Sequence, residues 1–185
     1  MERLNIPLNA DIAVCIYTAL LTETGSFRYA NTDADTFRLS ADMLKAGANP
    51  WIIAENIYNR NSLGRLNLLG LVLSNLTVHE NGKIAWITVR EEMYKETGTT
   101  KDDVEDFINY PRSIIGVEVA VLFRESNSDY KISMRSNGKV DVASIALVFG
   151  GGGHSMAAGC LVKGTLEEVK KKVLGRVEEA VMGMS

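Results

Sequence analysis

The 185-residue sequence contains only two cysteines and two histidines. Cys15 and Cys160 lie far apart in apolar stretches, so we expect two buried free thiols and no disulfide. A zinc site is not expected, because only His79 and His154 could join these cysteines. Free thiols, and the lack of a signal-peptide pattern in residues 1–5, favour a cytoplasmic protein.

The sequence also lacks long apolar runs and an excess of positive charge. Its longest apolar stretches, residues 12–21 and 68–73, are too short or too interrupted to span a bilayer. The net charge is -3, so there is no generally basic surface for long nucleic acids, and any such contact would be local. A hydrophobic content of 46% and a charged content of 23% are typical of a soluble globular protein.

Glycine, in contrast, is concentrated in the run Phe149-Gly-Gly-Gly-Gly-His154. A backbone without side chains can close its N–H groups around an anion, and His154 could donate to a phosphate. Shortly upstream, Arg135 and Ser136 end an expected strand. The strand, the basic residue, the following helix and the glycine run together predict a phosphate- or nucleotide-binding unit. A mobile glycine loop, a strand-end salt bridge for Arg135 and a structural hydrogen bond for His154 are the alternatives.

The rest of the chain divides into a helical first part and a second part that contains strands. We expect helices over residues 8–22, 32–45 (with Thr32 as N-cap), 50–59 and 60–76, with residues 27–31 extended. Asn81-Gly82 predicts a hairpin turn, and further strands are expected at residues 116–123, 130–135 and 159–163. Helices are expected over residues 100–107, 141–149 and after the capping box of Thr165 and Glu168. The predicted fold class is α/β, with four to five strands in a mixed sheet.

Two blocks of this sequence resemble the DHH phosphoesterase family. The first is residues 17–32, which contain Glu23-Thr-Gly25. The second combines residues 116–123, Ser133-Met-Arg-Ser136, Asp141-Val142 and residues 150–159. Within this family, the sequence resembles bacterial oligoribonucleases that also dephosphorylate 3′-phosphoadenosine 5′-phosphate. The resemblance divides the chain into the C-terminal part of a DHH catalytic domain (1–60), a linker helix (61–76) and a DHH-associated substrate-binding domain (77–185).

The resemblance implies a hydrolase with two divalent metal ions, Mn²⁺ or Mg²⁺, that acts on short RNA or a nucleotide. Arg135 would clamp a phosphate, Ser136 would add a hydroxyl, and Glu23 would be the metal ligand in this chain. A 5′-phosphate or the adjoining sugar would lie against Gly151, Gly152, Gly153 and His154. A homodimer is also expected.

The chain departs from the family pattern in the residues that would hold the metals. The Asp-His-His triplet and the early Asp-x-Asp are missing, and Glu23 stands where the family usually has aspartate. The chain is therefore similar to the C-terminal half of such an enzyme and is expected to be inactive alone. A non-catalytic nucleotide-binding module and a single-stranded DNA exonuclease of the same superfamily are the alternative functions.

Overall fold

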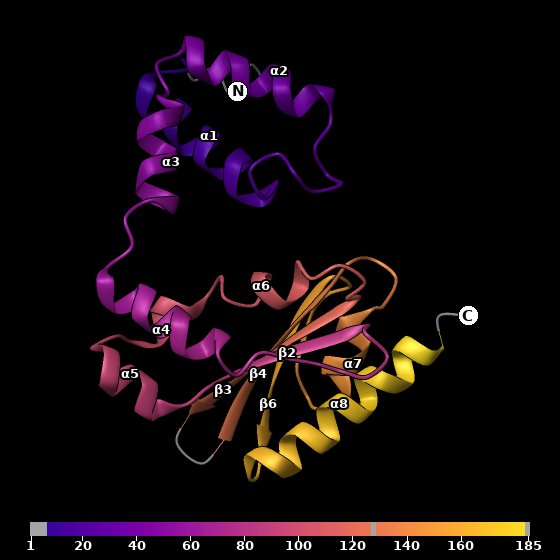
Figure 1. The fold of residues 1–185 in the computed structure, drawn as a ribbon. Coiled ribbons are helices and arrows are strands. Elements are labelled where there is room, and N and C mark those ends of the chain that lie inside the picture. Colours follow the sequence, from indigo (N-terminus) through magenta and orange to yellow (C-terminus); the bar gives the residue numbers. More distant parts are fainter. Residues whose placement is uncertain (1–6, 127–128, 184–185) are drawn as a thin grey trace. The chain divides into compact units, whose positions relative to one another are not determined.

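The structure, a computed structural model, describes residues 7–126 and 129–183 (Figure 1). The chain forms two compact units, Met1–Asn61 and Ser62–Ser185. The first unit contains the helices α1 (Ala10–Glu23), α2 (Ala34–Lys45) and α3 (Pro50–Tyr58). The helices of the second unit are α4 (Leu63–Leu73), α5 (Glu91–Thr97), the 3-10 helix η2 (Lys101–Val104), α6 (Asn109–Arg112), α7 (Val142–Val148) and α8 (Leu166–Met182). Its strands are β1 (Thr77–Val78), β2 (Ile84–Val89), β3 (Val119–Ser126), β4 (Asp129–Ser136), β5 (Gly152–His154) and β6 (Ala157–Lys163).

The first unit has a small core between its three helices. Its buried apolar residues are Ala13, Tyr17, Leu21, Met43, Ala48 and Ile53. Asn9 caps α1, as its side chain accepts a hydrogen bond from the Ile12 N–H at 2.9 Å. The expected N-cap of α2 was one residue too early, because the carboxylate of Asp33, not Thr32, accepts from the Thr36 N–H. Cys15 is exposed on α1, so the expectation that both thiols are buried was wrong for this one.

The second unit is built on a six-stranded sheet in the order β1-β2-β3-β4-β6-β5. β2 and β3 are parallel and the other pairs are antiparallel, which confirms a mixed α/β sheet. The Asn81-Gly82 turn joins β1 to β2 as expected, with Gly82 in the left-handed region at φ 67°.

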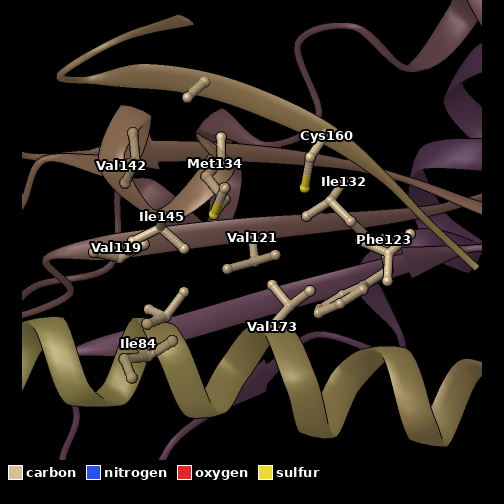
Figure 2. Packing of buried hydrophobic residues seen from close by; sticks show 14 of the residues in the cluster. Ile84, Val119, Val121, Phe123, Ile132, Met134, Val142, Ile145, Cys160 and Val173 are labelled. Atoms are coloured by element: carbon tan, nitrogen blue, oxygen red, sulfur yellow. The ribbon is translucent and has the colours of Figure 1, made fainter. Parts of the chain in front are cut away.

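One face of the sheet is covered by α7 and α8. Alternate strand residues such as Val121, Ile132 and Cys160 are buried there, together with Val173 of α8. Figure 2 shows Val173 directed towards Val121 and Phe123 of β3. This cluster is the larger of the two in the unit.

The opposite face of the sheet is covered over β2 and β3. A second cluster contains Ile87 and Val89 of β2, Ala120 and Leu122 of β3, and helix residues on α4, α5 and η2. Leu68 and Val72 of α4 are fully buried in it, so the helix that was expected as a linker contributes to the core of the second unit. No helix among the residues described is long and apolar enough to cross a membrane.

Candidate functional site

The second face of the sheet is open over β4, β6 and β5. Residues that pair across neighbouring strands have side chains on the same face. Arg135 pairs with Ala157, which in turn pairs with His154, so these three residues form one row across the three strands. Because the sheet residues of the second cluster come from β2 and β3, this row lies beside the covered area and not under it.

A second row runs parallel to the first. Ser133 pairs with Gly159, which pairs with Gly152. Four residues of the two rows are half-buried, and Gly152 and His154 are exposed. We call these six residues the open face: Ser133, Arg135, Gly152, His154, Ala157 and Gly159. Its floor consists of glycine, alanine and serine, with Arg135 on one side and His154 on the other.

The glycine run is ordered as a strand, which differs from the anion-binding loop that was expected. Gly152–His154 is the edge strand β5, paired with β6. A Cβ at Gly151 would collide with the Gly159 carbonyl and with Cys160. A Cβ at Gly153, where φ is 145°, would collide with the Ala157 carbonyl. These two glycines are thus required by the close approach of β5 to β6.

Gly152 has a different environment from its neighbours. A Cβ there would meet no atom within 4 Å, and the residue is exposed on the open face. The packing of the chain therefore gives no reason for a glycine at this position. The missing side chain leaves room for an outside group to approach the backbone.

The structure separates Ser136 from the other expected site residues. Ser136 follows Arg135 directly, so its side chain points to the opposite face, where it is 2% exposed. Its hydroxyl donates to Glu118 Oε1 at 3.2 Å and accepts from the Gly138 N–H at 3.0 Å. Ser136 thus stabilises the turn after β4 and lies away from the open face.

Arg135 is held at the end of β4 by its own strand. Its Nη1 donates to the Met134 carbonyl at 3.1 Å, and the residue is half-buried. The helix that leads to β5 is fixed by Asp141, whose carboxylate accepts from the Ala143 N–H at 2.9 Å. Both flanks of the open face are thus anchored by local hydrogen bonds.

Ser133 was not predicted as part of this surface. Residues 130–135 alternate strictly: Tyr130, Ile132 and Met134 are buried in the first cluster, and the polar residues between them face the other way. This period-two pattern placed Ser133 on the same face as Arg135 and could have identified it.

Glu23 lies in the first unit, at the end of α1, and is exposed. The three residues Gly25, Ser26 and Phe27 have φ values of 55°, 62° and 61°. The chain after Glu23 is thus a left-handed turn, in contrast to the extended segment expected at residues 27–31. Such a conformation costs about 1–2 kcal/mol for each non-glycine residue.

Aromatic packing holds this turn. Phe27 stacks on Phe37 with ring centroids 5.2 Å apart and meets the edge of Tyr17 at 6.3 Å. Thr24 is buried, and its hydroxyl donates to the Leu20 carbonyl and accepts from the Phe27 N–H. The segment that follows Glu23 is therefore rigidly attached to α1.

The described side chains do not assemble a metal centre around Glu23. Within residues 7–126 and 129–183, there is no group of three or more His, Cys, Asp or Glu side chains placed to hold a metal ion. The described side chains alone therefore do not supply the ligands that the expected pair of metal ions needs.

Comparison with known proteins identifies the family. Residues 81–183 match the DHHA1 domain, and the chain belongs to this family. It is 33% identical over 180 residues to the bifunctional oligoribonuclease and PAP phosphatase NrnA of Thermus thermophilus, covering 97% of this chain and 54% of that protein. The NrnA protein of Bacillus subtilis is 25% identical over 155 residues, covering 84% of this chain and 49% of that protein.

A solved structure agrees in fold. An exopolyphosphatase-related protein from Bacteroides fragilis matches with a TM-score of 0.89 at 34% identity, covering 95% of this chain and 52% of that chain. The chain thus spans about half the length of the relatives that it matches. The resemblance to NrnA-type proteins of the DHH phosphoesterase family is confirmed, as is the mixed α/β fold.

Proposed function

We propose that the open face binds a phosphate group of a short oligoribonucleotide or of 3′-phosphoadenosine 5′-phosphate. The observation that carries the proposal is the row in which Arg135 and His154 lie on either side of Ala157. Two strand spacings separate their Cα atoms by about 10 Å, a gap that an arginine and a histidine can close around one phosphate. The names of the relatives, oligoribonuclease and PAP phosphatase, support this class of substrate.

The chemistry of the open face suits a short substrate. The guanidinium of Arg135 can donate two parallel hydrogen bonds to two phosphate oxygens, and His154 can donate from a ring nitrogen. Gly152, Gly159 and Ala157 leave the floor low enough for a sugar or base to lie against it. The net charge of -3 suits a ligand with few phosphates.

We further propose that the whole reaction is metal-dependent hydrolysis of such substrates, with Mn²⁺ or Mg²⁺ as cofactor and Glu23 as one ligand. The position of Glu23 beside a rigid turn supports this role. The other ligands would come from outside the residues described, so we expect the isolated chain to bind without hydrolysing. A non-catalytic nucleotide-binding module remains the alternative, and sustained phosphate release with Mn²⁺ that is lost in Glu23→Ala would exclude it.

We also propose that the chain self-associates through its first unit. Trp51 is 70% exposed, Phe37 is 56% exposed and Ile52 is 48% exposed. Several large exposed apolar side chains on a unit with a small core favour an interaction surface.

The test of the open face compares two arginines. Arg135→Ala should weaken binding of 3′-phosphoadenosine 5′-phosphate by about 1.5–3 kcal/mol, the range for a hydrogen bond to a charged group. The matched control is Arg124→Ala on β3. It removes the same charge, but Arg124 lies four residues along β3 from Ala120, the residue that pairs with Arg135. Titration calorimetry should show a loss for Arg135→Ala and little change for Arg124→Ala. Equal affinity of Arg135→Ala and the wild-type chain would remove Arg135 from the site.

A further inference from the structure

The side of the sheet that carries the open face has a third row beyond the two already described. In this row Arg124 of β3 pairs with Lys131 of β4, which pairs with Leu161 of β6. Lys131 lies two residues from Ser133, so its side chain is on the same side of the sheet as those of Ser133 and Arg135. Lys131 and Leu161 are exposed and Arg124 is half-buried, so the third row is accessible to a ligand.

Two like charges stand directly opposite each other in the third row. Arg124 and Lys131 are paired positions of an antiparallel ladder, where opposed like charges are destabilising. Neither residue forms an ion pair with an acidic side chain in the part of the chain that the structure describes. Arg124 is also held in place, because its Nη1 donates to the Lys101 carbonyl at 2.9 Å. The fold therefore maintains a repulsion that a bound anion would relieve.

The cationic part of this side of the sheet ends at the third row. In the next row Asp129 pairs with Ser126 of β3 and with Lys163 of β6. The charges of Asp129 and Lys163 thus stand on neighbouring positions and offset each other. A cationic surface remains between Arg135 and Lys131, which are four residues apart and therefore about 13 Å apart along β4.

The two strands at the centre of this surface differ in chemistry. On β4 the residues of the three rows are polar or cationic: Arg135, Ser133 and Lys131. On β6, about 5 Å away, they are small or apolar: Ala157, Gly159 and Leu161. Leu161 is 55% exposed, which leaves an apolar side chain beside the lysine. A single-stranded oligonucleotide has the same division, because its phosphates seek cations and the faces of its bases seek apolar surfaces.

We propose that an oligoribonucleotide lies along β4, with a phosphate between Lys131 and Arg124 and a base against Leu161. The proposal rests on the proposed function, in which the open face holds the first phosphate. A mononucleotide occupies the open face alone, whereas a longer strand also reaches the third row. The third row therefore makes the second unit prefer oligonucleotides to mononucleotides.

The experiment compares two ligands on the 185-residue chain by titration calorimetry in EDTA, which prevents metal-dependent hydrolysis. The ligands are 3′-phosphoadenosine 5′-phosphate and a 5′-phosphorylated tetra-adenylate RNA. Lys131→Gln should weaken binding of the tetranucleotide about fivefold, as expected for a partly exposed charge pair. It should also reduce the slope of log affinity against log salt concentration by about 0.7, the value for one phosphate contact of a single strand.

Three comparisons make this test specific. Lys131→Gln should leave binding of 3′-phosphoadenosine 5′-phosphate unchanged, because the mononucleotide does not reach the third row. Arg124→Ala should likewise weaken only the tetranucleotide. Lys171→Gln, which changes an exposed lysine on α8 at the other face of the sheet, should affect neither ligand.

The melting temperature of the chain without ligand gives a second measurement. Lys131→Gln removes the repulsion from Arg124, so it should raise the melting temperature at low salt by about 2 °C. A melting temperature equal to or below that of the wild type would show that the opposed charges cost no stability, and it would overturn the proposal.

The outcomes distinguish this proposal from the proposed function. Suppose that 3′-phosphoadenosine 5′-phosphate binds and depends on Arg135, while Lys131→Gln affects the tetranucleotide no more than Lys171→Gln does. The proposal for the third row is then wrong and the open face stands. If neither ligand binds, the open face is not a phosphate site and both proposals are wrong. An equal loss for both ligands in Lys131→Gln would mean that the lysine acts through general charge, which also overturns the third-row contact.

Discussion

Consecutive glycines at the start of β5 and just before it have different physical roles. Gly151 and Gly153 leave no space for a Cβ, because β6 lies too close. Gly152 has open space, and it alternates with them onto the open face. Packing therefore accounts for Gly151 and Gly153, and a left-handed φ of 73° accounts for Gly150, whereas neither reason applies to Gly152.

The same alternation decides which predicted site residues come together. Arg135 and His154 have paired positions across Ala157, whereas Ser136 is turned to the other face. The sequence singled out Arg135 and His154, and the sheet does bring these two residues into one row. The alternation of Tyr130, Ile132 and Met134 already placed Ser136 on the face opposite to Arg135, but the prediction of the site did not use it.

The two cysteines should differ sharply in reactivity. Burial raises the pKa of the Cys160 thiol to about 11, so that about one molecule in a thousand carries the reactive thiolate at pH 8. Cys15 is exposed on α1. A chromogenic disulfide reagent should therefore titrate one thiol rapidly in the native protein and two in denaturant.

The control for this labelling is Cys15→Ser, which should leave no rapidly reacting thiol. Two fast thiols in the native wild-type chain would show that Cys160 is accessible, and that the β6 side of the large cluster opens readily.

At the scale of elements, local signals predicted some helix starts and missed another by one residue. Thr165 accepts a hydrogen bond from the Glu168 N–H at the start of α8, as the expected capping box requires, whereas the N-cap of α2 is Asp33 and not the expected Thr32. Elements that depend on tertiary contacts were not predicted. β5 exists because β6 offers it a partner, and residues 100–107 form only a short 3-10 helix, Lys101–Val104.

The capping box of α8 should be measurable. Thr165 Oγ1 accepts from the Glu168 N–H, and Glu168 Oε2 accepts from the Thr165 N–H at 3.0 Å. Thr165→Ala should lower the free energy of unfolding by about 1 kcal/mol, while Thr165→Ser should be close to wild type. Urea unfolding followed by circular dichroism measures both, and equal stability of the alanine variant would show that this cap contributes nothing.

The pH dependence of the same cap has a definite sign. The backbone hydrogen bond from Thr165 lowers the pKa of Glu168 from its ordinary value of 4.5. A carboxyl with a lowered pKa in the folded state stabilises the fold fully above its ordinary pKa. The stability difference between wild type and Glu168→Gln should thus be present at neutral pH and vanish as the pH falls through the lowered value.

At the scale of the whole molecule, the two units differ in how much apolar surface they bury. The second unit has two extensive clusters, one on each face of its sheet. Among its described residues, from position 7 onward, the first has six buried apolar residues and several large exposed ones. The sequence already indicated an excess of apolar side chains over what this small core can bury, because residues 8–22 are strongly apolar.

We therefore expect the first unit to open before the second and to drive self-association. Hydrogen exchange should be early in α1 and slow in β3 and β4, because the amides of α1 are protected by a much smaller core. Sedimentation of the wild-type chain should show dimers or larger species as concentration rises. Trp51→Glu should shift this equilibrium towards the monomer, whereas Lys171→Glu, a charge change on α8 of the second unit, should not. A wild-type chain that stays monomeric, with equal protection in α1 and β3, would mean that three helices and their small core are self-sufficient.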